Sequence, residues 1–69
     1  MELSARNVLE GTVKEVNLGM VNAEVVVELA SGVELVSVIT KGSSERLGLP
    51  AGKKVYAVVK ASNVMIATE

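Results

Sequence analysis

The sequence predicts an all-β fold of five short strands, with one short helix between the third and fourth strands. Apolar residues make up 49% of the 69 residues, yet Tyr56 is the only aromatic side chain. The apolar content is therefore mostly Val, Leu, Ile and Ala, a composition rich in residues that favour strands. Several segments alternate polar and apolar residues with a period of two, and glycines lie between them at positions typical of turns.

The first predicted strand spans residues 7–18. Its apolar residues change parity between Val13 and Val16. A change of parity inside a strand indicates an inserted residue, so we expect a β-bulge near Lys14 or Glu15. The bulge would also bend the strand, as a small barrel requires.

The second and third predicted strands form a hairpin. After a turn at Gly19, residues 21–29 alternate polar and apolar side chains. Val26 breaks the polar set, and we expect it to face a neighbour. Ser31-Gly32 is a hairpin signal, and it leads into a third strand over residues 33–39 that is largely apolar on both faces.

A short helix is predicted within residues 40–50. Ser43 or Ser44 is the expected N-cap, and Gly48 is expected to end the helix. The fourth strand is predicted over residues 54–60, with Val55, Ala57 and Val59 facing inward. After an interruption at residues 61–63, a short fifth strand is predicted over residues 64–67.

Five strands with a helix between the third and the fourth is the element order of an OB-like Greek-key barrel. A simple meander barrel is the alternative topology, and periodicity does not separate the two. In either case we expect a single domain over residues 1–69.

The size of the chain favours oligomerisation. A domain this small buries only about 60% of the surface that its unfolded chain exposes, and small folds compensate with disulfides, metals or oligomerisation. The sequence has no cysteine and no histidine, which excludes disulfides and the usual zinc ligands. We therefore expect apolar strand faces to become subunit interfaces. The alternative is that the extra valines lie on the strands without forming an interface.

Several function classes are disfavoured. Without histidine or cysteine, nucleophile–base pairs built from them cannot form, and Glu24 and Glu28 have the spacing of solvated strand positions, so we expect no enzyme. The net charge of −1 and the single aromatic residue disfavour binding of nucleic acid. The chain shows neither a signal peptide nor an apolar run long enough to cross a membrane. These features predict a cytoplasmic protein with no membrane partner.

Three polar clusters lie at the ends of otherwise apolar strands: Ser4-Ala5-Arg6-Asn7, Thr40-Lys41-Gly42-Ser43-Ser44 and Lys60-Ala61-Ser62-Asn63. Together they offer hydroxyl, amide and backbone donors, two cations in Arg6 and Lys60, and the N-terminus of the predicted helix. This donor set suits a small tetrahedral dianion. Taken alone, the residues favour a simpler interpretation, in which the serines cap turns and the cations are surface charges.

The whole chain resembles the molbindins, or Mop proteins. No single motif is specific, but their order and spacing match the family. The matching segments are Ser4-Ala5-Arg6-Asn7, Gly11, Val21-Asn22-Ala23-Glu24-Val25, Val38-Ile39-Thr40, Arg46-Leu47-Gly48-Leu49 and Lys60-Ala61-Ser62-Asn63-Val64-Met65.

The resemblance implies an OB-like five-stranded barrel that binds molybdate or tungstate between subunits of a homohexamer, a trimer of dimers. It further implies intracellular storage or buffering of the oxyanion, with no cofactor and no directly coordinated metal cation. Related domains occur in molybdate-responsive regulators and in importer ATPases. The alternative function is a structural or regulatory oligomerisation module without a physiological anion.

The resemblance also implies the oxyanion-binding residues. Ser4 and Arg6 match positions contributed by one subunit. The partner subunit would contribute Thr40, Ser43, Lys60, the backbone N–H of Ala61, and Ser62 alongside. Asn22 matches a position that is a polar neighbour of the ligand in some relatives. Further pockets near a threefold axis depend on backbone groups, so no side chain identifies them here.

Overall fold

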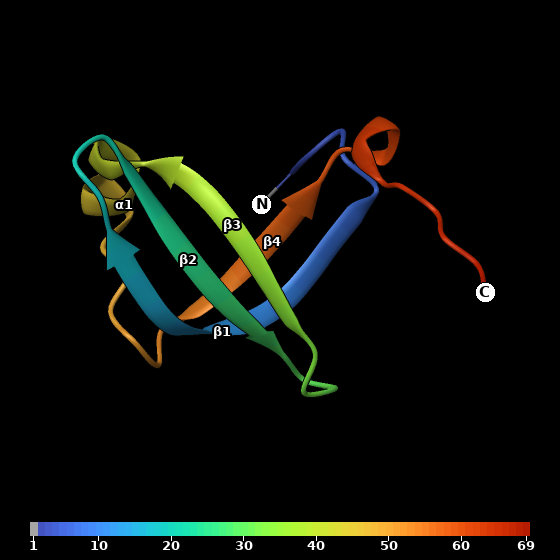
Figure 1. The fold of residues 1–69 in the computed structure, drawn as a ribbon, viewed down its shortest axis with the longest axis horizontal. Coiled ribbons are helices and arrows are strands. Elements are labelled where there is room, and N and C mark those ends of the chain that lie inside the picture. Colours follow the sequence, from blue (N-terminus) through green and yellow to red (C-terminus); the bar gives the residue numbers. More distant parts are fainter. Residues whose placement is uncertain (1) are drawn as a thin grey trace.

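The computed structural model describes residues 2–69, in which four antiparallel strands form one bent sheet shaped like half a barrel (Figure 1). The elements are β1 (Asn7–Leu18), β2 (Asn22–Leu29), β3 (Glu34–Thr40), α1 (Lys41–Leu47), β4 (Lys54–Val59) and the 3₁₀ turn η1 (Ala61–Asn63). The predicted all-β class, with a short helix between the third and fourth strands, is confirmed.

The strand order distinguishes the two topologies that the sequence left open. Within the sheet the order is β3-β2-β1-β4, so the connection that contains α1 carries β4 back to β1. Three consecutive hairpin-connected strands with a fourth beside the first make up a Greek key. A meander would pair β4 with β3. The Greek-key prediction is therefore confirmed.

The predicted bulge lies in the middle of β1. Val13 pairs with Val27 and Glu15 pairs with Val26, so the register shifts across Lys14. The turn before β4 is hydrogen-bonded to β1 at the same place. The Val13 N–H donates to the Lys53 carbonyl (2.9 Å), and the Gly52 N–H donates to the Val13 carbonyl (2.8 Å). The bulge, together with these hydrogen bonds, bends β1, and the bent strand gives the sheet the shape of a half-barrel.

Helix α1 ends as predicted but begins earlier. Gly48 caps its C-terminus with a φ of 59°, a left-handed conformation that favours glycine. The predicted N-cap at Ser43 or Ser44 is wrong, because Thr40 caps the helix and both serines lie inside it. Thr40 is the last residue of β3 and keeps an extended backbone, so its side chain can turn back and accept the Ser43 N–H (3.1 Å).

The predicted fifth strand is absent from the described residues. After β4 the chain passes through η1 and leaves the sheet, so residues 64–67 have no strand partner. Met65 and Ile66 are 92% and 86% exposed. The other strands match their predictions to within a residue at each end.

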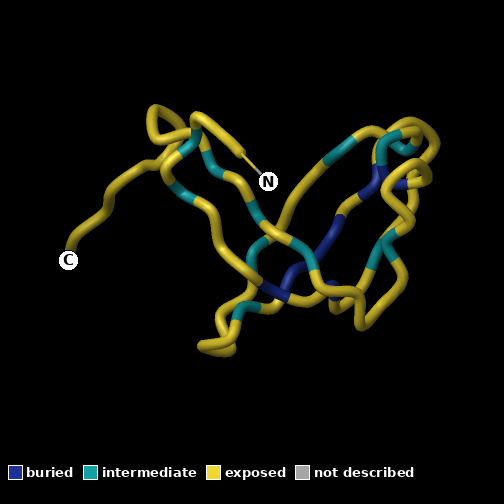
Figure 2. The backbone as a smooth tube through the Cα atoms, turned by 180° about the vertical axis from the view of Figure 1, so that it is seen from behind, coloured by how far each residue is buried: buried dark blue, intermediate teal, exposed yellow. Residues whose placement is uncertain are grey.

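The core lies at the base of the half-barrel, where β1 pairs with β2, and Figure 2 shows the buried residues gathered in the interior of the bend. Val13, Val25 and Val27 form its buried centre, and partly buried side chains from all four strands and from the loop after α1 pack against them. Val26 is only 6% exposed, so the prediction that it faces a neighbour is wrong. In β4, Val55, Ala57 and Val59 are less exposed than the residues between them, as predicted.

Candidate oxyanion-binding site

The predicted site residues divide into two groups that lie at opposite ends of the sheet (Figure 1). The terminal group lies beside the start of β1 and the end of β4, and the helix group lies where β3 meets α1. The terminal group is Ser4, Arg6, Lys60, Ala61 and Ser62, and the helix group is Asn22, Thr40 and Ser43.

The terminal group is assembled by the pairing of β1 with β4. Asn7 pairs with Val59, so Arg6 and Lys60 are the next residues beyond the last pair of the ladder. Both side chains are exposed, and neither takes part in the ion pairs found within residues 2–69. This end of the sheet therefore carries two cations that are free to meet an anion.

Residues 60–63 continue the terminal group with backbone donors. Lys60 precedes η1 and makes no side-chain cap. The bonds that close η1 run from the Asn63 N–H to the Lys60 carbonyl (2.8 Å) and from the Val64 N–H to the Ala61 carbonyl (3.2 Å). These bonds do not use the Ala61 N–H, which the resemblance singles out as an anion donor.

The helix group is fixed by the end of the β2–β3 ladder. Asn22 pairs with Thr40 in the register. The Lys41 N–H donates to the Val21 carbonyl (2.8 Å), which ties the first residue of α1 to the segment before β2. Asn22, Thr40 and the start of α1 therefore lie next to one another.

Within the helix group, the Ser43 hydroxyl is oriented by two donors. Its oxygen accepts from the Thr40 hydroxyl (2.8 Å) and from the Arg46 guanidinium (3.0 Å). A serine hydroxyl has two acceptor positions and one hydrogen. Since both acceptor positions are filled, the hydrogen of Ser43 is left to donate outward.

Arg46 is a residue that the sequence reasoning missed as a site residue. It adds a cation to an end of the sheet where the prediction had placed only neutral ligands. The signal was its spacing, because residues three apart on a helix lie on the same face, and Arg46 is three residues after Ser43. Only one of the five N–H groups of the guanidinium is used by Ser43.

The N-terminus of α1 offers fewer free backbone donors than expected. The Lys41 N–H is bonded to Val21 and the Ser43 N–H to Thr40. An anion at this end would therefore be held mainly by the side chains of Ser43 and Arg46 rather than by the helix backbone.

One chain does not bring the two groups together. The terminal group lies at the Asn7 end of β1, whereas the helix group lies beside the Leu18 end. Twelve residues of bent strand separate them. The grouping also differs from the division that the resemblance implies, since Lys60 lies on the same side as Arg6 and not with Thr40.

Other features of the described residues lie outside both groups. No cluster of His, Cys, Asp or Glu suited to a metal ion occurs in residues 2–69, and neither helical element there is long and apolar enough to cross a membrane. A hydrogen bond to Glu10, together with its charge, raises the pKa of Lys54 above its usual value. Its ammonium lies 3.2 Å from the Glu10 carboxylate.

Comparisons with known proteins give a consistent result. "Molybdenum-pterin-binding protein 3" of Clostridium pasteurianum is 47% identical and covers 96% of this chain and 97% of its own length. A molybdate-binding protein from Sporomusa ovata is 44% identical, with a TM-score of 0.92 over 99% of this chain and all of its own.

A third similar protein is described as the cytoplasmic molybdate-binding protein ModG, in a form with molybdate bound. It is 51% identical, with a TM-score of 0.90 over 94% of this chain and 46% of its own. The resemblance to the Mop proteins is thereby confirmed. Since the TOBE domain family matches residues 3–66, the chain belongs to the TOBE domain family.

Proposed function

We propose that this protein binds molybdate in pockets between the subunits of a homo-oligomer, and that it stores or buffers the anion in the cytoplasm. Tungstate, which is almost the same size, is expected to bind as well. The observation that carries the proposal is the division of the polar residues into two groups at opposite ends of one sheet. Neither group alone surrounds an anion, whereas two copies together can do so.

The chemistry of the two groups supports a dianion. Positive charge comes from Arg6 and Lys60 of the terminal group and from Arg46, which contacts Ser43 of the helix group. Hydrogen bonds from charged donors to an anion are stronger than those from neutral donors. Ser4, Ser62 and Ser43 supply hydroxyl donors, and Asn22 supplies an amide. No carboxylate belongs to either group, so the set favours a fully ionised anion.

We propose that each pocket takes the terminal group of one copy and the helix group of another. The assembly is a hexamer, a trimer of dimers, of single Mop domains over residues 1–69, of which residue 1 lies outside the described residues. The relatives named above are binding proteins, which supports a binding role rather than an enzyme. Nucleic acid and membranes are not expected partners.

Native mass spectrometry with and without molybdate tests the assembly and the ligand together. We expect a hexamer that retains molybdate at a fixed number of sites. Retention of the hexamer with no bound molybdate would favour the alternative function, an oligomerisation module without a physiological anion. A monomer that binds no anion would overturn both functions.

Calorimetric titration tests the specificity. Sulfate has the same charge and shape but is smaller, so donors held rigidly by two subunits cannot all close on it. An unsatisfied buried donor costs about 1–3 kcal/mol, and molybdate should therefore bind more than tenfold tighter than sulfate. Phosphate should bind more weakly still, because its remaining O–H would face a donor. Equal affinities for sulfate and molybdate would contradict the pocket.

A mixing experiment tests whether the pocket is shared. Arg6→Ala removes a cation from the terminal group and Ser43→Ala removes a hydroxyl from the helix group. The first should weaken binding more than tenfold, since hydrogen bonds to charged groups contribute about 1.5–3 kcal/mol. When the two variants are unfolded and refolded together, about one pocket in four would receive two intact halves by random pairing, and tight binding should return at those pockets.

The control for the mixing experiment is Lys14→Ala, which removes a cation from the middle of β1, outside both groups. It should bind molybdate normally. If the mixed oligomer binds no more tightly than either variant alone, both halves of the pocket belong to one chain and the shared site is refuted.

A further inference from the structure

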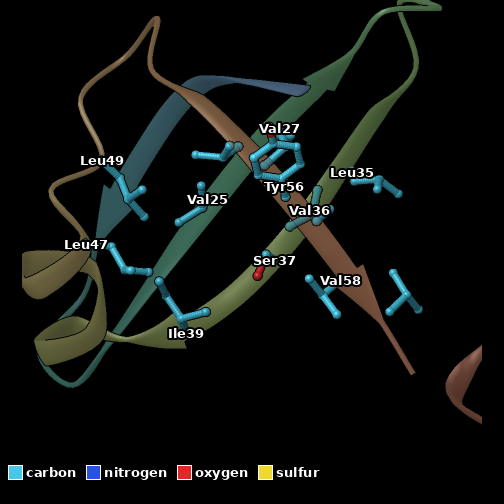
Figure 3. A pocket seen from close by; sticks show the side chains of 13 residues that line it. Val25, Val27, Leu35, Val36, Ser37, Ile39, Leu47, Leu49, Tyr56 and Val58 are labelled. Atoms are coloured by element: carbon cyan, nitrogen blue, oxygen red, sulfur yellow. The ribbon is translucent and has the colours of Figure 1, made fainter. Parts of the chain in front are cut away.

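Helix α1 carries two rows of side chains, and one row fixes how the other is presented. Residues three apart on a helix share a face, so Ser44 and Leu47 form one row and Ser43 and Arg46 form the other. Ser44 is buried, and Leu47 lies beside Ile39 in the open apolar groove between β3 and β4 (Figure 3). Since this first row holds the helix against the sheet, the second row is kept outside the groove.

The second row ends in a hydroxyl hydrogen that is left for a ligand. The Arg46 guanidinium donates to Oγ of Ser43 (3.0 Å), and the Thr40 hydroxyl donates to the same oxygen (2.8 Å). Thr40 in turn accepts the Ser43 N–H (3.1 Å), which holds the three residues together. A serine oxygen accepts two hydrogen bonds, so Ser43 can donate to a ligand but cannot accept from one.

Arg46 points its charge at this neutral hydroxyl rather than at a carboxylate. Neither of the ion pairs found in the part of the chain that the structure describes involves Arg46. A charged donor polarises the hydroxyl that accepts from it, and a polarised hydroxyl is a stronger donor to the next group. Arg46 therefore does two things to Ser43: it fills an acceptor position of the oxygen and strengthens the hydrogen as a donor.

The neutral groups elsewhere in the proposed pocket are not restricted in this way. The Asn22 amide can turn either its NH₂ or its carbonyl oxygen toward a ligand, so it suits an ionised or a protonated oxygen. The hydroxyls of Ser4 and Ser62 belong to the terminal group, whose two cations disfavour the hydrogen of a protonated anion. Discrimination between the two kinds of oxygen at the helix group therefore depends on Ser43.

We propose that Arg46 is a positioning residue that makes the pocket selective for fully ionised tetrahedral dianions, and that it acts through the Ser43 hydroxyl rather than by contact with the anion. This inference rests on the proposed function. With Arg46 present, Ser43 donates to an ionised oxygen but meets a protonated oxygen donor to donor. Without Arg46, an acceptor position of Ser43 opens, and an anion that carries an O–H, such as hydrogen phosphate, can donate to it.

Calorimetric titration of the full chain at neutral pH tests the selectivity, with the phosphate affinity measured by displacement of molybdate. Arg46→Met removes the guanidinium and keeps an unbranched stem. We expect the ratio of molybdate affinity to phosphate affinity to fall about tenfold, because a donor no longer faces a donor. The ratio of molybdate to sulfate affinity should stay the same, since sulfate carries no O–H. Arg46→Lys keeps a charged donor and should restore most of the selectivity.

A double-mutant cycle separates positioning from direct contact. In a Ser43→Ala background, Arg46→Met should leave the molybdate-to-phosphate ratio unchanged, because the hydroxyl through which Arg46 acts is gone. The matched control is Lys41→Met, which removes another cation of α1 that is not among the donors to Ser43 within residues 2–69. Its ratio should equal that of the wild type.

Two results would overturn the role of Arg46. If Arg46→Met lowers the affinities for all three anions by the same factor, and does so again in the Ser43→Ala background, Arg46 contacts the anion directly. If the wild type binds molybdate and Arg46→Met keeps the wild-type selectivity, the role of Arg46 is refuted and the proposed function stands. A wild type that binds none of the three anions would refute the proposed function, and this inference with it.

Discussion

The base of the half-barrel and its two rims use the same type of side chain in opposite ways. At the base, Val13 is 1% exposed and packs against Val25 and Val27. On the rim, Val36 of β3 is 62% exposed. The difference is that flanking side chains of the same chain cover the base valines, whereas Val36 lies on the open side of the groove between β3 and β4 and stays exposed. Apolar content alone therefore does not tell which valines are buried and stabilise the fold and which remain exposed on the surface of the chain.

The largest expected effect on stability comes from replacing a valine of the base by alanine, and the matching change on the rim is its comparison. Val13→Ala removes two buried methyl groups and leaves a cavity, and we expect it to lower the free energy of unfolding by about 2–3 kcal/mol. Val36→Ala should change that free energy little while weakening association. Chemical denaturation and light scattering at several protein concentrations separate the two effects. Equal losses of folding stability would mean that base and rim do not differ.

Gly11 tests how tightly the base is packed. A Cβ atom there would lie 2.6 Å from Cγ1 of Val27 and 2.8 Å from the carbonyl oxygen of Glu28. Backbone cannot move away as a flexible side chain does, so Gly11→Ala should destabilise the fold by about 1–3 kcal/mol through overpacking. Gly42→Ala is the control, since a Cβ at that position would meet no atom within 4 Å apart from its chain neighbours and the backbone of its own helix. Comparable thermal melts for both variants would contradict this account.

Thr40 lies where a rim strand ends and α1 begins, and its effect should be smaller. Thr40→Ala removes the side-chain acceptor of the Ser43 N–H, and loss of such a cap costs about 1 kcal/mol. Thr40→Ser keeps the hydroxyl and should restore most of the stability. The test is denaturation without molybdate, and a serine variant as unstable as the alanine variant would exclude capping as the cause.

The smallest effect should come from the exposed ion pair between Lys14 at the bulge and Glu34 at the start of β3. The hydrogen bond to Glu34, and then its charge, raises the pKa of Lys14 above 10.5. A lysine with a raised pKa in the folded state contributes stability that is complete below its unfolded pKa and is lost as the pH rises through the folded pKa.

Because exposed pairs contribute little, Glu34→Gln should leave the melting temperature at pH 7 unchanged within error. Any difference in melting temperature between the variant and the wild type should be present throughout the neutral range and disappear only above pH 10.5. A large decrease in the melting temperature at pH 7 would mean that the ion pair stabilises the fold more than an exposed pair is expected to.

Local patterns predicted the local features correctly. The change of parity after Val13 located the bulge, and Gly48 marked the end of the helix. The capping residue was missed because Ser43, Ser44 and Thr40 are all good N-caps, and only the end of β3 decides among them. The prediction of a strand over residues 64–67 followed from their apolar character. A strand must also pair with an edge of the sheet, and after η1 these residues leave the sheet without pairing with one.

The candidate site came from the resemblance as a set of residues, and its arrangement required the structure. The residue types at Arg6, Lys60 and Ser43 suit an anion but do not by themselves indicate one, and their distribution over two ends of the sheet depends on the β1–β4 and β2–β3 registers. Arg46 was missed for the same reason, since its value comes from the contact with Ser43 rather than from its position in the sequence.

The pairing of β1 with β4 has a consequence for how the chain folds. β1, β2 and β3 are joined by short turns, so their ladders form between near neighbours in the sequence. Asn7, in contrast, pairs with Val59 near the other end of the chain, and the entropy of closing so long a loop must be met before that ladder contributes. We therefore expect the three-stranded meander to form early during synthesis, and the rate of folding to be set by the arrival of β4.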